Sequence, residues 1–566
     1  MGEIMINLKA SPFYLTDDDI KWVEDSYSSM SLEEKIGQLF CPIVFTSDET
    51  ELKQLVEKKQ IGGVLYREGQ GEEIQNSHRY LQKYSKIPLL TAANLEMGGT
   101  GSATEGTYYG REMLIAATDN VERAYQLGKI SCREGAAVGV NWAFAPVVDI
   151  DREFRNPITN VRTFGSDYKR VIAMGEAYMK AAKEEGVAVS IKHFPGDGTD
   201  ERDQHLLTSV NSLSCEEWDK SYGEIYKTLI DKGALTVMAG HIALPAYEEA
   251  MDKKESEKII PATLSKNLLQ HLLREKLGFN GLIATDATPM VGFCSAMERR
   301  TAVPTAIENG CDIFLFNKDI EEDFNYMTEG YQKGILSEKR LEEAVLRILA
   351  LKAALKLHEK QKEGTLVPGK EALSILRCAE HDRMAQECAD EGVTLVKDTQ
   401  QLIPINVTSH KRILLEMLGD FDSNDRVYGI FEKLLSDAGF EITKYQQENF
   451  SRPLDTVEEF KNKYDMVLYI GNIETASNKT VSRINWYTFF GLGNNVPWFV
   501  EEVPAVFVSV GNPYHLMDVP MIKTFINGYC NSEYVINAIV GKMLGKSEFK
   551  GKSPVDPFCG RKDTRF

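Results

Sequence analysis

The 566-residue sequence lacks both a long hydrophobic run and an excess of positive charge. No segment approaches the roughly 20 consecutive apolar residues that a membrane-spanning helix needs. Lysine and arginine number 65 against 84 aspartates and glutamates, which gives a formal net charge of -19. A surface of that sign repels phosphate backbones and anionic lipid headgroups. The composition therefore predicts neither a nucleic-acid partner nor a role at a membrane surface.

The sequence also lacks paired cysteines. Its nine cysteines are scattered, odd in number and never spaced as Cys-x-x-Cys, so neither a disulfide framework nor a structural zinc site is predicted. The N-terminal stretch MGEIMINLKASPFYLTDDD has no apolar signal core. Reduced thiols and the missing signal predict a cytoplasmic protein. The glycine-rich stretch Met97–Gly110 contains no phosphate-binding pattern, so we expect no nucleotide cofactor. Because no cysteine or histidine spacing matches a structural zinc pattern, we also expect no metal.

The sequence does contain a regular alternation of short β-rich runs and long amphipathic stretches. Helical patterns begin near the N-terminus, where Ser31 and Glu34 have the spacing of a capping box. In Ser265–Lys276 four leucines form one stripe, and Gly278 follows as a C-cap. Strand candidates lie at 39–45, 61–66, 88–93, 140–147, 187–191, 235–239, 282–285 and 312–316.

Eight strands separated by helices suggest a (β/α)8 barrel or a large doubly wound sheet. Polar residues gathered just after the strand ends favour the barrel. A closing helix is predicted over 337–358, followed by a polar linker with glycine and proline and a second, shorter alternation. We therefore predict an α/β chain with a TIM-type barrel over 1–358, a linker and connecting helix over 359–386, and a smaller α/β-sandwich domain over 387–566.

Two groups of residues could carry chemistry in such a barrel. Asp286 ends an apolar strand candidate, where a barrel mouth would present it to a ligand, although aspartate is also a common helix N-cap. Asp203 and His205 lie in a glycine-rich loop after the fifth strand candidate. A carboxylate beside a histidine orients the ring and raises its pKa, which gives a usable general acid. For an isolated Asp-x-His pattern, a solvated loop is the alternative.

Further polar candidates follow other strand ends. Lys192, directly after an apolar strand, needs an acceptor such as a sugar hydroxyl or a neighbouring carboxylate. Arg162 could donate a bidentate pair of hydrogen bonds to ligand hydroxyls or form a surface salt bridge. His193 and His241 could meet at a metal, but their spacing matches no structural zinc pattern. The other candidates at strand ends are Asn94, Glu96, Asp149 and Asp151.

Several segments, in their order along the chain, resemble the signatures of glycoside hydrolase family 3. The resemblance runs from about Ser31 to about Val555, and its most specific part is KHFPG followed by Asp-x-His. It implies a barrel followed by an α/β-sandwich domain, and glycoside cleavage with retention through a covalent glycosyl-enzyme. The segments are SLEEKIGQLF, NPITNVRTFGSD, IKHFPGDGTDERDQH, VMAGHIALP, PATLSKNLLQHLLREKLGFNGLIATDA and VFVSVGNPYHLMDVP.

The resemblance also implies roles for single residues. Asp286 corresponds to the nucleophile, and in the branch that resembles β-N-acetylglucosaminidases His205 is the acid/base with Asp203 as its partner. These residue types suit the chemistry, because a carboxylate attacks the anomeric carbon while an acid protonates the leaving oxygen. The substrate-binding set that it implies consists of Asn94, Glu96, Arg162, Lys192, His193 and His241.

Two positions depart from the family pattern. Asn94 stands where the family usually has a sugar-binding aspartate, and Asp197 stands where these hexosaminidases commonly have histidine. An asparagine still bonds hydroxyls, but the preference for N-acetylglucosamine is less secure. The leading hypothesis is an exo-acting retaining β-N-acetylhexosaminidase that acts on an oligosaccharide or a cell-wall fragment, and the sequence does not indicate the oligomeric state.

Three other functions stay open at the sequence level. A β-glucosidase of the same family would take a glutamate acid/base from the second domain, for which Glu474, Glu501 and Glu502 are candidates. Arg483 and Trp486 could line the site or form part of a surface loop. A phosphorylase would use phosphate as the acceptor, and a neutral histidine repels phosphate less than a carboxylate does. The third function is a barrel that binds carbohydrate without catalysis.

Overall fold

The chain folds into two compact units, which are described separately below. The computed structural model describes residues 6–67, 69–251, 259–419, 422–446, 455–473, 475–486, 488–489, 492–493 and 495–566. One unit contains the described parts of Met1–Tyr108, Ala124–Glu153 and Asp167–His381. The other contains Tyr109–Arg123, Phe154–Ser166 and the described parts of Asp382–Phe566. Two segments of the predicted barrel domain thus belong to the unit of the C-terminal sheet, and the boundaries 1–358, 359–386 and 387–566 stay predictions.

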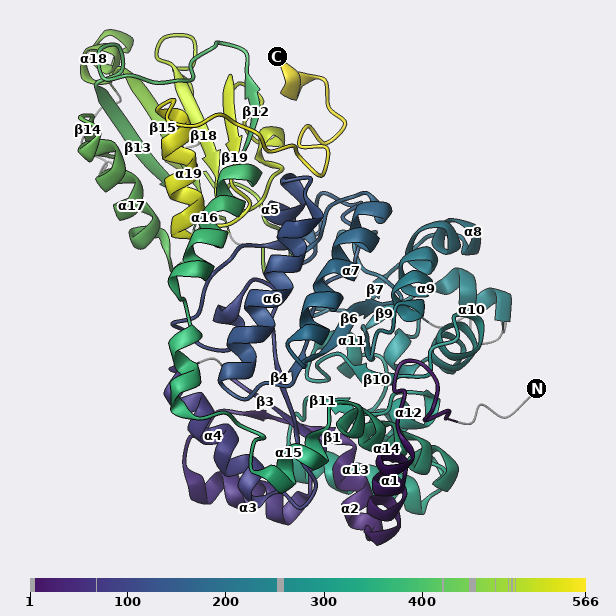
Figure 1. Ribbon diagram of the computed structural model, residues 1–566. Helices are drawn as coiled ribbons and strands as arrows, with labels where there is room; N and C mark the ends of the chain where they lie inside the picture. The colour runs from purple at the N-terminus through teal and green to yellow at the C-terminus, as the bar shows by residue number, and fades with distance from the viewer. Residues whose placement is uncertain are drawn as a thin grey trace. The chain divides into compact units, whose positions relative to one another are not determined.

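The first unit holds a ring of parallel strands (Figure 1). Hydrogen bonds close the ring, because Thr285 N donates to Ile313 O at 3.1 Å and Gly62 N donates to Phe40 O at 3.0 Å. The first strand is split in two at Pro42, which has no N–H to donate. Among the described residues the strands are β1 (Phe40–Cys41), β2 (Ile43–Val44), β3 (Gly63–Tyr66), β4 (Leu90–Ala93), β5 (Trp142–Ala143), β6 (Ala188–Phe194), β8 (Thr236–Ala239), β10 (Leu282–Thr285) and β11 (Phe314–Leu315). The predicted (β/α)8 barrel is confirmed.

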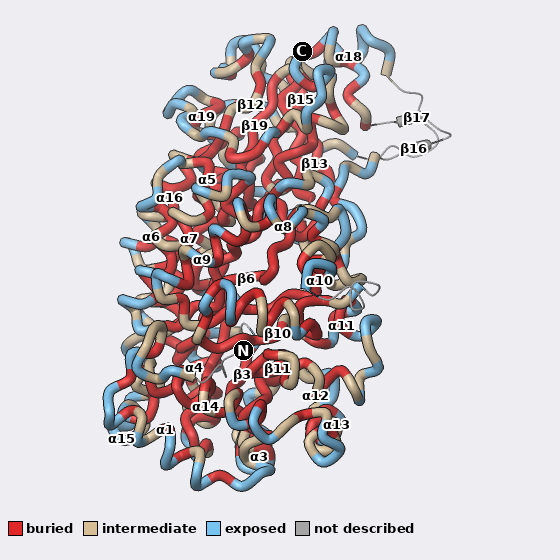
Figure 2. The backbone as a smooth tube through the Cα atoms, turned by 90° about the vertical axis from the view of Figure 1, so that its right-hand side faces the viewer, coloured by how far each residue is buried: buried red, intermediate tan, exposed pale blue. Residues whose placement is uncertain are grey.

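Burial explains why most residues of these strands are apolar. In a parallel barrel one face packs inward and the other is covered by helices, so neither face is exposed to water. Figure 2 shows β6 and β10 as buried segments. The helices of this unit include α1 (Asp17–Ser29), α2 (Leu32–Gln38), α3 (Glu49–Lys59), α4 (Gly71–Tyr84), α6 (Val121–Ala137), α7 (Tyr168–Glu184), α9 (Glu224–Asp231), α10 (Pro245–Met251), α12 (Arg299–Asn309), α13 (Ile320–Gln332), α14 (Glu338–Ala354) and α15 (Leu357–Glu363).

Two helix features that the sequence predicts, a capping box and a leucine stripe, are present in the structure. Ser31 caps α2 as predicted, since Glu34 N donates to Ser31 Oγ at 3.2 Å and Ser31 N donates to Glu34 Oε2 at 2.7 Å. The leucine stripe of Ser265–Lys276 is fully buried, but the segment Asn267–Lys276 is wound as a π-helix. None of the helices described is long and apolar enough to cross a membrane.

The second unit is built on a mixed sheet with strand order β12-β19-β18-β15-β13-β14, in which only β12 runs antiparallel to its neighbour. Its strands are β12 (Thr394–Asp398), β13 (Arg412–Leu418), β14 (Glu441–Lys444), β15 (Met466–Gly471), β18 (Ala505–Ser509) and β19 (Thr524–Asn527). Its helices include α5 (Glu112–Ala117), α16 (Ala379–Gly392), α17 (Asn424–Asp437), α18 (Val457–Lys463) and α19 (Glu533–Met543). This is the α/β-sandwich domain that the sequence predicts.

Candidate active site

Asp286 directly follows β10, at the carboxyl end of the barrel. Its backbone N donates to Ala239 O at 2.8 Å, which ties it to the end of β8. Its side chain is 14% exposed, and Oδ1 accepts a hydrogen bond from Ala287 N at 2.7 Å. The next helix, α11 (Val291–Cys294), begins after Met290. Asp286 therefore does not cap a helix, and the carboxylate lies at a barrel mouth as a ligand-facing group would.

The surroundings of Asp286 favour its ionised form. Burial by itself raises the pKa of this carboxyl, but the positive charge that His193, His241 and His205 can carry lowers it, and the hydrogen bond from Ala287 adds to that effect. The net result is a pKa below the ordinary aspartate value of 3.8. His193 Nε2 lies 3.9 Å from Asp286 Oδ2. A carboxylate that stays ionised near neutral pH meets the first requirement for a nucleophile.

The loop after β6 brings His205 against Asp203. His205 Nδ1 lies 2.7 Å from Asp203 Oδ1, and the backbone N of His205 donates to the same oxygen at 2.9 Å. The Asp203 side chain is fully buried, while the His205 side chain is 24% exposed. A buried carboxylate bonded to Nδ1 fixes the orientation of a partly exposed ring, which is the arrangement of a general acid/base. This burial argues against the solvated-loop alternative.

The acceptor that the Lys192 ammonium needs is the carboxylate of Glu96. Its Nζ lies 2.6 Å from Glu96 Oε1, and both side chains are nearly buried. Lys192 belongs to β6 and Glu96 follows β4, so two strand ends are joined by this ion pair. Asn94 follows the same strand β4 and is exposed. Three residues of the predicted substrate-binding set therefore lie at the carboxyl ends of β4 and β6.

His241 is bonded on both ring nitrogens. Nδ1 lies 3.0 Å from Thr263 Oγ1 and Nε2 lies 3.0 Å from Ala287 O, while the backbone N donates to Gln204 Oε1 at 2.7 Å. Complete burial lowers the pKa of this imidazole. With both nitrogens engaged, His241 links the ends of β8 and β10 to the loop that carries the Asp203–His205 pair.

A second aspartate–histidine pair lies beside the nucleophile candidate. His193 Nδ1 lies 2.7 Å from Asp149 Oδ2. The other carboxylate oxygen, Oδ1, accepts hydrogen bonds from His193 N at 3.1 Å and from Asp197 N at 2.8 Å. Burial, and then the charge of Asp149, raise the pKa of the Asp197 carboxyl well above its ordinary value. Asp197 is thus a buried acid close to the pair, at the position where the resemblance expects histidine.

The metal alternative gains no support from His193 and His241. Their ring nitrogens bond to Asp149, Thr263 and Ala287. Within the described ranges, the side chains grouped closely enough to share an ion are elsewhere, at Asp19, His358 and Glu359. There the ammonium of Lys356 already lies 2.8 Å from both Asp19 carboxylate oxygens.

Arg162 belongs to the second compact unit. It ends a short 3-10 helix, Asn160–Arg162, and its Nη1 lies 3.4 Å from Ile158 O. The side chain of Asn160 at the start of this turn is buried, and its amide lies 3.4 Å from Asn512 Oδ1. The structure therefore places Arg162 with the C-terminal sheet, and its role toward a sugar stays a prediction.

The other candidates from the second domain have structural partners. Glu501 and Glu502 form ion pairs with Lys523 and Lys461. Arg483 Nε donates to Asp518 Oδ1 at 2.8 Å, and the Trp486 ring packs edge-on against Tyr469. Glu474 lies outside the described residues.

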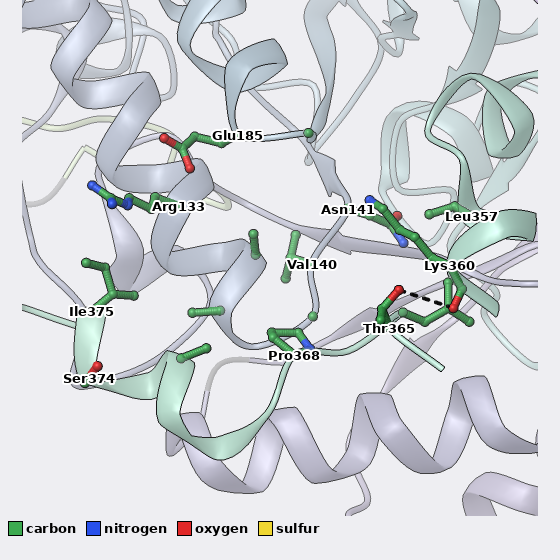
Figure 3. A pocket seen from close by; sticks show the side chains of 16 residues that line it. Arg133, Val140, Asn141, Glu185, Leu357, Lys360, Thr365, Pro368, Ser374 and Ile375 are labelled. Carbon is green, nitrogen blue, oxygen red and sulfur yellow. Dashed lines mark hydrogen bonds between the residues drawn. The ribbon is translucent and has the colours of Figure 1, made fainter. Parts of the chain in front are cut away.

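A cavity of about 460 Å³ opens at the opposite end of the barrel strands (Figure 3). Val140 and Asn141 line it just before β5, and Glu185 and Gly186 line it just before β6. These are the amino ends of the strands, where barrel residues serve stability rather than catalysis. In Figure 3 apolar side chains fill much of the wall between Arg133 and Lys360. The cavity is therefore distinct from the carboxyl-end site around Asp286.

Comparison with known proteins identifies the family. The model of the glycosyl hydrolase family 3 N terminal domain matches residues 31–351. The chain belongs to glycoside hydrolase family 3. A relative from Cellulomonas fimi, named beta-N-acetylglucosaminidase/beta-glucosidase, is 44% identical over 573 residues, which cover 99% of this chain and 100% of the relative. The family assignment makes this chain a glycosidase whose substrate is a carbohydrate.

Two solved structures share the fold of nearly the whole chain. The beta-glucoside phosphorylase BglX bound to 2FGlc superposes with a TM-score of 0.94 at 42% identity, over 98% of this chain and 99% of that chain. A family 3 beta-N-acetylglucosaminidase from Paenibacillus sp. superposes with a TM-score of 0.79 at 22% identity, over 94% of this chain and 100% of that chain, which shows the shared fold alone.

In this family 3 enzyme, sequence reasoning missed the bonds of Thr263 and Gln204 to His241 and the pairing of Asp149 with His193. Thr263 and Gln204 bond to His241, and Asp149 holds His193. Asp149 had a detectable signal, because it follows a strand candidate, but nothing in the sequence pairs it with His193. Thr263 and Gln204 are ordinary polar residues in loops, and only the fold shows what they contact.

Proposed function

We propose that this family 3 enzyme cleaves terminal β-glucosides and β-N-acetylglucosaminides with retention of configuration. Asp286 is the nucleophile, and His205, held by Asp203, is the acid/base. The observation that carries the proposal is the 2.7 Å contact between His205 Nδ1 and a fully buried Asp203 carboxylate, on the loop after β6. It gives the barrel its own acid/base, so no glutamate from the second domain is required.

The chemistry takes two displacements at the anomeric carbon. In the first, an Asp286 oxygen bonds to that carbon, the glycosidic C–O bond breaks, and the leaving oxygen takes the proton from His205 Nε2. In the second, the acceptor gives its proton to His205 and its oxygen bonds to the anomeric carbon, which releases the Asp286 carboxylate. Each displacement inverts the centre, so the product keeps the β configuration.

Several groups support binding of the sugar. The ammonium of Lys192 and the carboxylate of Glu96 offer a donor and an acceptor at neighbouring strand ends. Asn94 carries an amide that both donates to and accepts from hydroxyls. We propose that Arg162, His193 and His241 also bind the sugar. The relative that is 44% identical is named for both sugars, which supports activity on glucosides as well as on N-acetylglucosaminides.

A product analysis tests this function. Purified enzyme is given aryl β-glucoside and aryl β-N-acetylglucosaminide in separate reactions, and the anomer released first is followed by proton NMR. We expect both substrates to be cleaved and the β anomer to appear before mutarotation. Initial release of the α anomer would show a single inverting displacement, and cleavage of only one substrate would remove the other sugar from the proposal.

Phosphate is a second candidate acceptor, and two observations favour it. The solved structure that is 42% identical over 98% of this chain is named a beta-glucoside phosphorylase. The acid/base candidate is also a histidine, which carries no negative charge when neutral. Two like charges about 4 Å apart repel by about 1 kcal/mol in water and by about 4 kcal/mol in a partly buried site, so a carboxylate acid/base would oppose phosphate strongly.

The acceptor is identified by the same assay with inorganic phosphate at millimolar concentrations. For phosphorolysis we expect the rate to rise with phosphate concentration and the product to change from free sugar to the β-configured sugar 1-phosphate. A rate and a product that do not depend on phosphate would leave water as the acceptor.

A further inference from the structure

The carboxylate of Asp149 contacts three hydrogen-bond donors. Two are backbone N–H groups, of His193 and Asp197, and both point at Oδ1. The third contact, 2.7 Å long, joins the Nδ1 atom of the His193 ring to Oδ2. The Asp149 side chain is only 1% exposed, so water cannot replace these partners freely. A carboxylate in this position acts solely as an acceptor.

The acceptor role of Asp149 decides where the His193 ring carries its proton. A bond from Nδ1 to a carboxylate requires hydrogen on Nδ1, and the neutral ring then presents a lone pair at Nε2. Nε2 points toward the nucleophile candidate, 3.9 Å from Asp286 Oδ2. That distance exceeds a hydrogen bond, and a lone pair and a carboxylate oxygen do not bond to each other. A hydroxyl group placed near both atoms can donate to Nε2.

The glycine-rich loop after β6 provides one of the backbone donors that bond to the Asp149 carboxylate. The N–H of Asp197 reaches Oδ1 because the loop turns at Gly196 and Gly198, which have φ angles of +117° and +101°. A Cβ atom at Gly198 would lie 2.0 Å from the carbonyl oxygen of Ile150, so only glycine allows this approach. The loop thus supplies one of the two backbone donors that fix the Asp149 carboxylate.

We propose that Asp149 is a positioning residue that makes His193 a hydrogen-bond acceptor for one hydroxyl of the sugar, next to the attacked carbon. The inference rests on the proposed function, because it assumes that the sugar lies against Asp286. It also gives the consecutive pair Lys192-His193 complementary roles. The ammonium of Lys192 only donates, whereas the ring of His193 accepts, and a sugar hydroxyl that donates to His193 can also accept from another group.

The charged groups around Asp149 and His193 do not change the inferred role of His193 Nε2 as an acceptor. Asp286 faces Nε2, and Asp197 donates its backbone N–H to Asp149 Oδ1. His205 and His241 act on Asp286 through their charge rather than through contact with His193. Among the described residues, none of these groups places a donor within hydrogen-bond distance of His193 Nε2. A substrate hydroxyl is therefore the donor that we infer for this atom.

Asp149→Asn tests whether Asp149 sets the tautomer of His193 or only holds its ring in place. The asparagine has the same shape, and its single oxygen can keep the two backbone N–H donors. Its amide N–H group then faces Nδ1, which must accept, so the proton of the neutral ring moves to Nε2. His193 becomes a donor toward the site. In serine proteases, where a buried aspartate holds the catalytic histidine in the same way, the change to asparagine gives the wrong tautomer and lowers kcat by about 10⁴-fold.

The experiment compares aryl β-glucosides in which each ring hydroxyl in turn is replaced by hydrogen. For the native enzyme we expect one position at which kcat/KM falls at least about tenfold, the loss of one hydrogen bond to a buried group. For D149N we expect kcat/KM on the intact glucoside to be about 10²- to 10³-fold lower, with no further loss when that hydroxyl is removed. Thermal unfolding checks that the variant is folded.

Asp203→Asn is the matched control, because it makes the same change on the other aspartate–histidine pair. It should slow all the deoxy substrates by the same factor and keep the sensitivity to the one hydroxyl. If D149N keeps that sensitivity too, Asp149 only supports the fold and the inference is overturned. If D149N does not fold, His193→Gln is measured in the same way, and retained sensitivity there has the same meaning. Failure of the native enzyme to cleave any aryl β-glucoside or aryl β-N-acetylglucosaminide would instead refute the proposed function.

Discussion

Asp286→Ala is expected to lower kcat by at least about 10⁴-fold, because the variant has no oxygen that can bond to the anomeric carbon. Substrate binding should change far less, since the contacts that Lys192 and Glu96 offer at the ends of β6 and β4 are untouched. The nucleophile of the native enzyme should also stay ionised in mildly acidic solution. The pKa of Asp286 is lowered, so the nucleophile is present above that pKa and is lost only as the pH falls through it, below the ordinary value of 3.8.

Azide gives the decisive measurement for this variant. The small anion can enter the space left by the Asp286 carboxylate and attack the anomeric carbon from that side. A β-glycoside is then converted in one inversion to the α-glycosyl azide, which NMR identifies. The native enzyme, given the same azide concentration, is the control for reaction in solution. Unchanged activity of Asp286→Ala without azide would rule out Asp286 as the nucleophile.

The second large effect is expected at the acid/base pair. His205→Ala should lower kcat by about 10²- to 10⁴-fold on substrates whose leaving group needs a proton. Asp203→Asn should act in the same direction, because the ring of His205 loses the buried carboxylate that orients Nδ1. For both variants the loss should shrink as the leaving phenol becomes more acidic, since a stable phenolate departs without protonation.

The leaving-group series distinguishes acid catalysis from damage to the fold. Rates for phenyl, nitrophenyl and dinitrophenyl β-glycosides are measured for His205→Ala and for the native enzyme. Azide should now give the β-glycosyl azide, because Asp286 still forms the covalent intermediate and azide attacks it from the opposite face. A loss of equal size for all three substrates would contradict the acid/base role of His205.

Most of the barrel was predictable because of how its strands are buried. Residues that are covered on both sides must be apolar, so runs such as Val187–Ile191 stand out in the sequence. The boundaries were less accurate, and the candidate at 140–147 shrinks to Trp142–Ala143. In the second unit the edge strand β14, Glu441–Lys444, is polar and largely exposed, so no apolar run indicates it in the sequence. The segment 359–386, predicted as a linker and connecting helix, begins within helix α15.

The site was predictable where a polar residue interrupts an apolar pattern or where two polar residues have a characteristic spacing. Asp286 and Lys192 are conspicuous for that reason, and Asp203 and His205 are conspicuous through their spacing. What they contact depends on strands that are far apart in sequence, as in the bond between His193 and Asp149, which lie 44 residues apart. Single-sequence patterns carry no information about such pairs, so the tautomer of His193 could not be inferred before the fold was known.

The membership of two early segments in the C-terminal unit has a consequence for synthesis on the ribosome. Helix α5 is buried along its whole length, and a Cβ at Gly110 would lie within 3.8 Å of Cys530 Sγ. The backbone of Ser166 donates to Pro554 O at 3.2 Å. These partners are translated more than 380 residues later, at about 5 to 20 residues per second. For tens of seconds α5 contacts the turn Asn160–Arg162 but lacks the partners that come from the C-terminal part of the chain. In that interval its uncovered apolar side chains are available to chaperones.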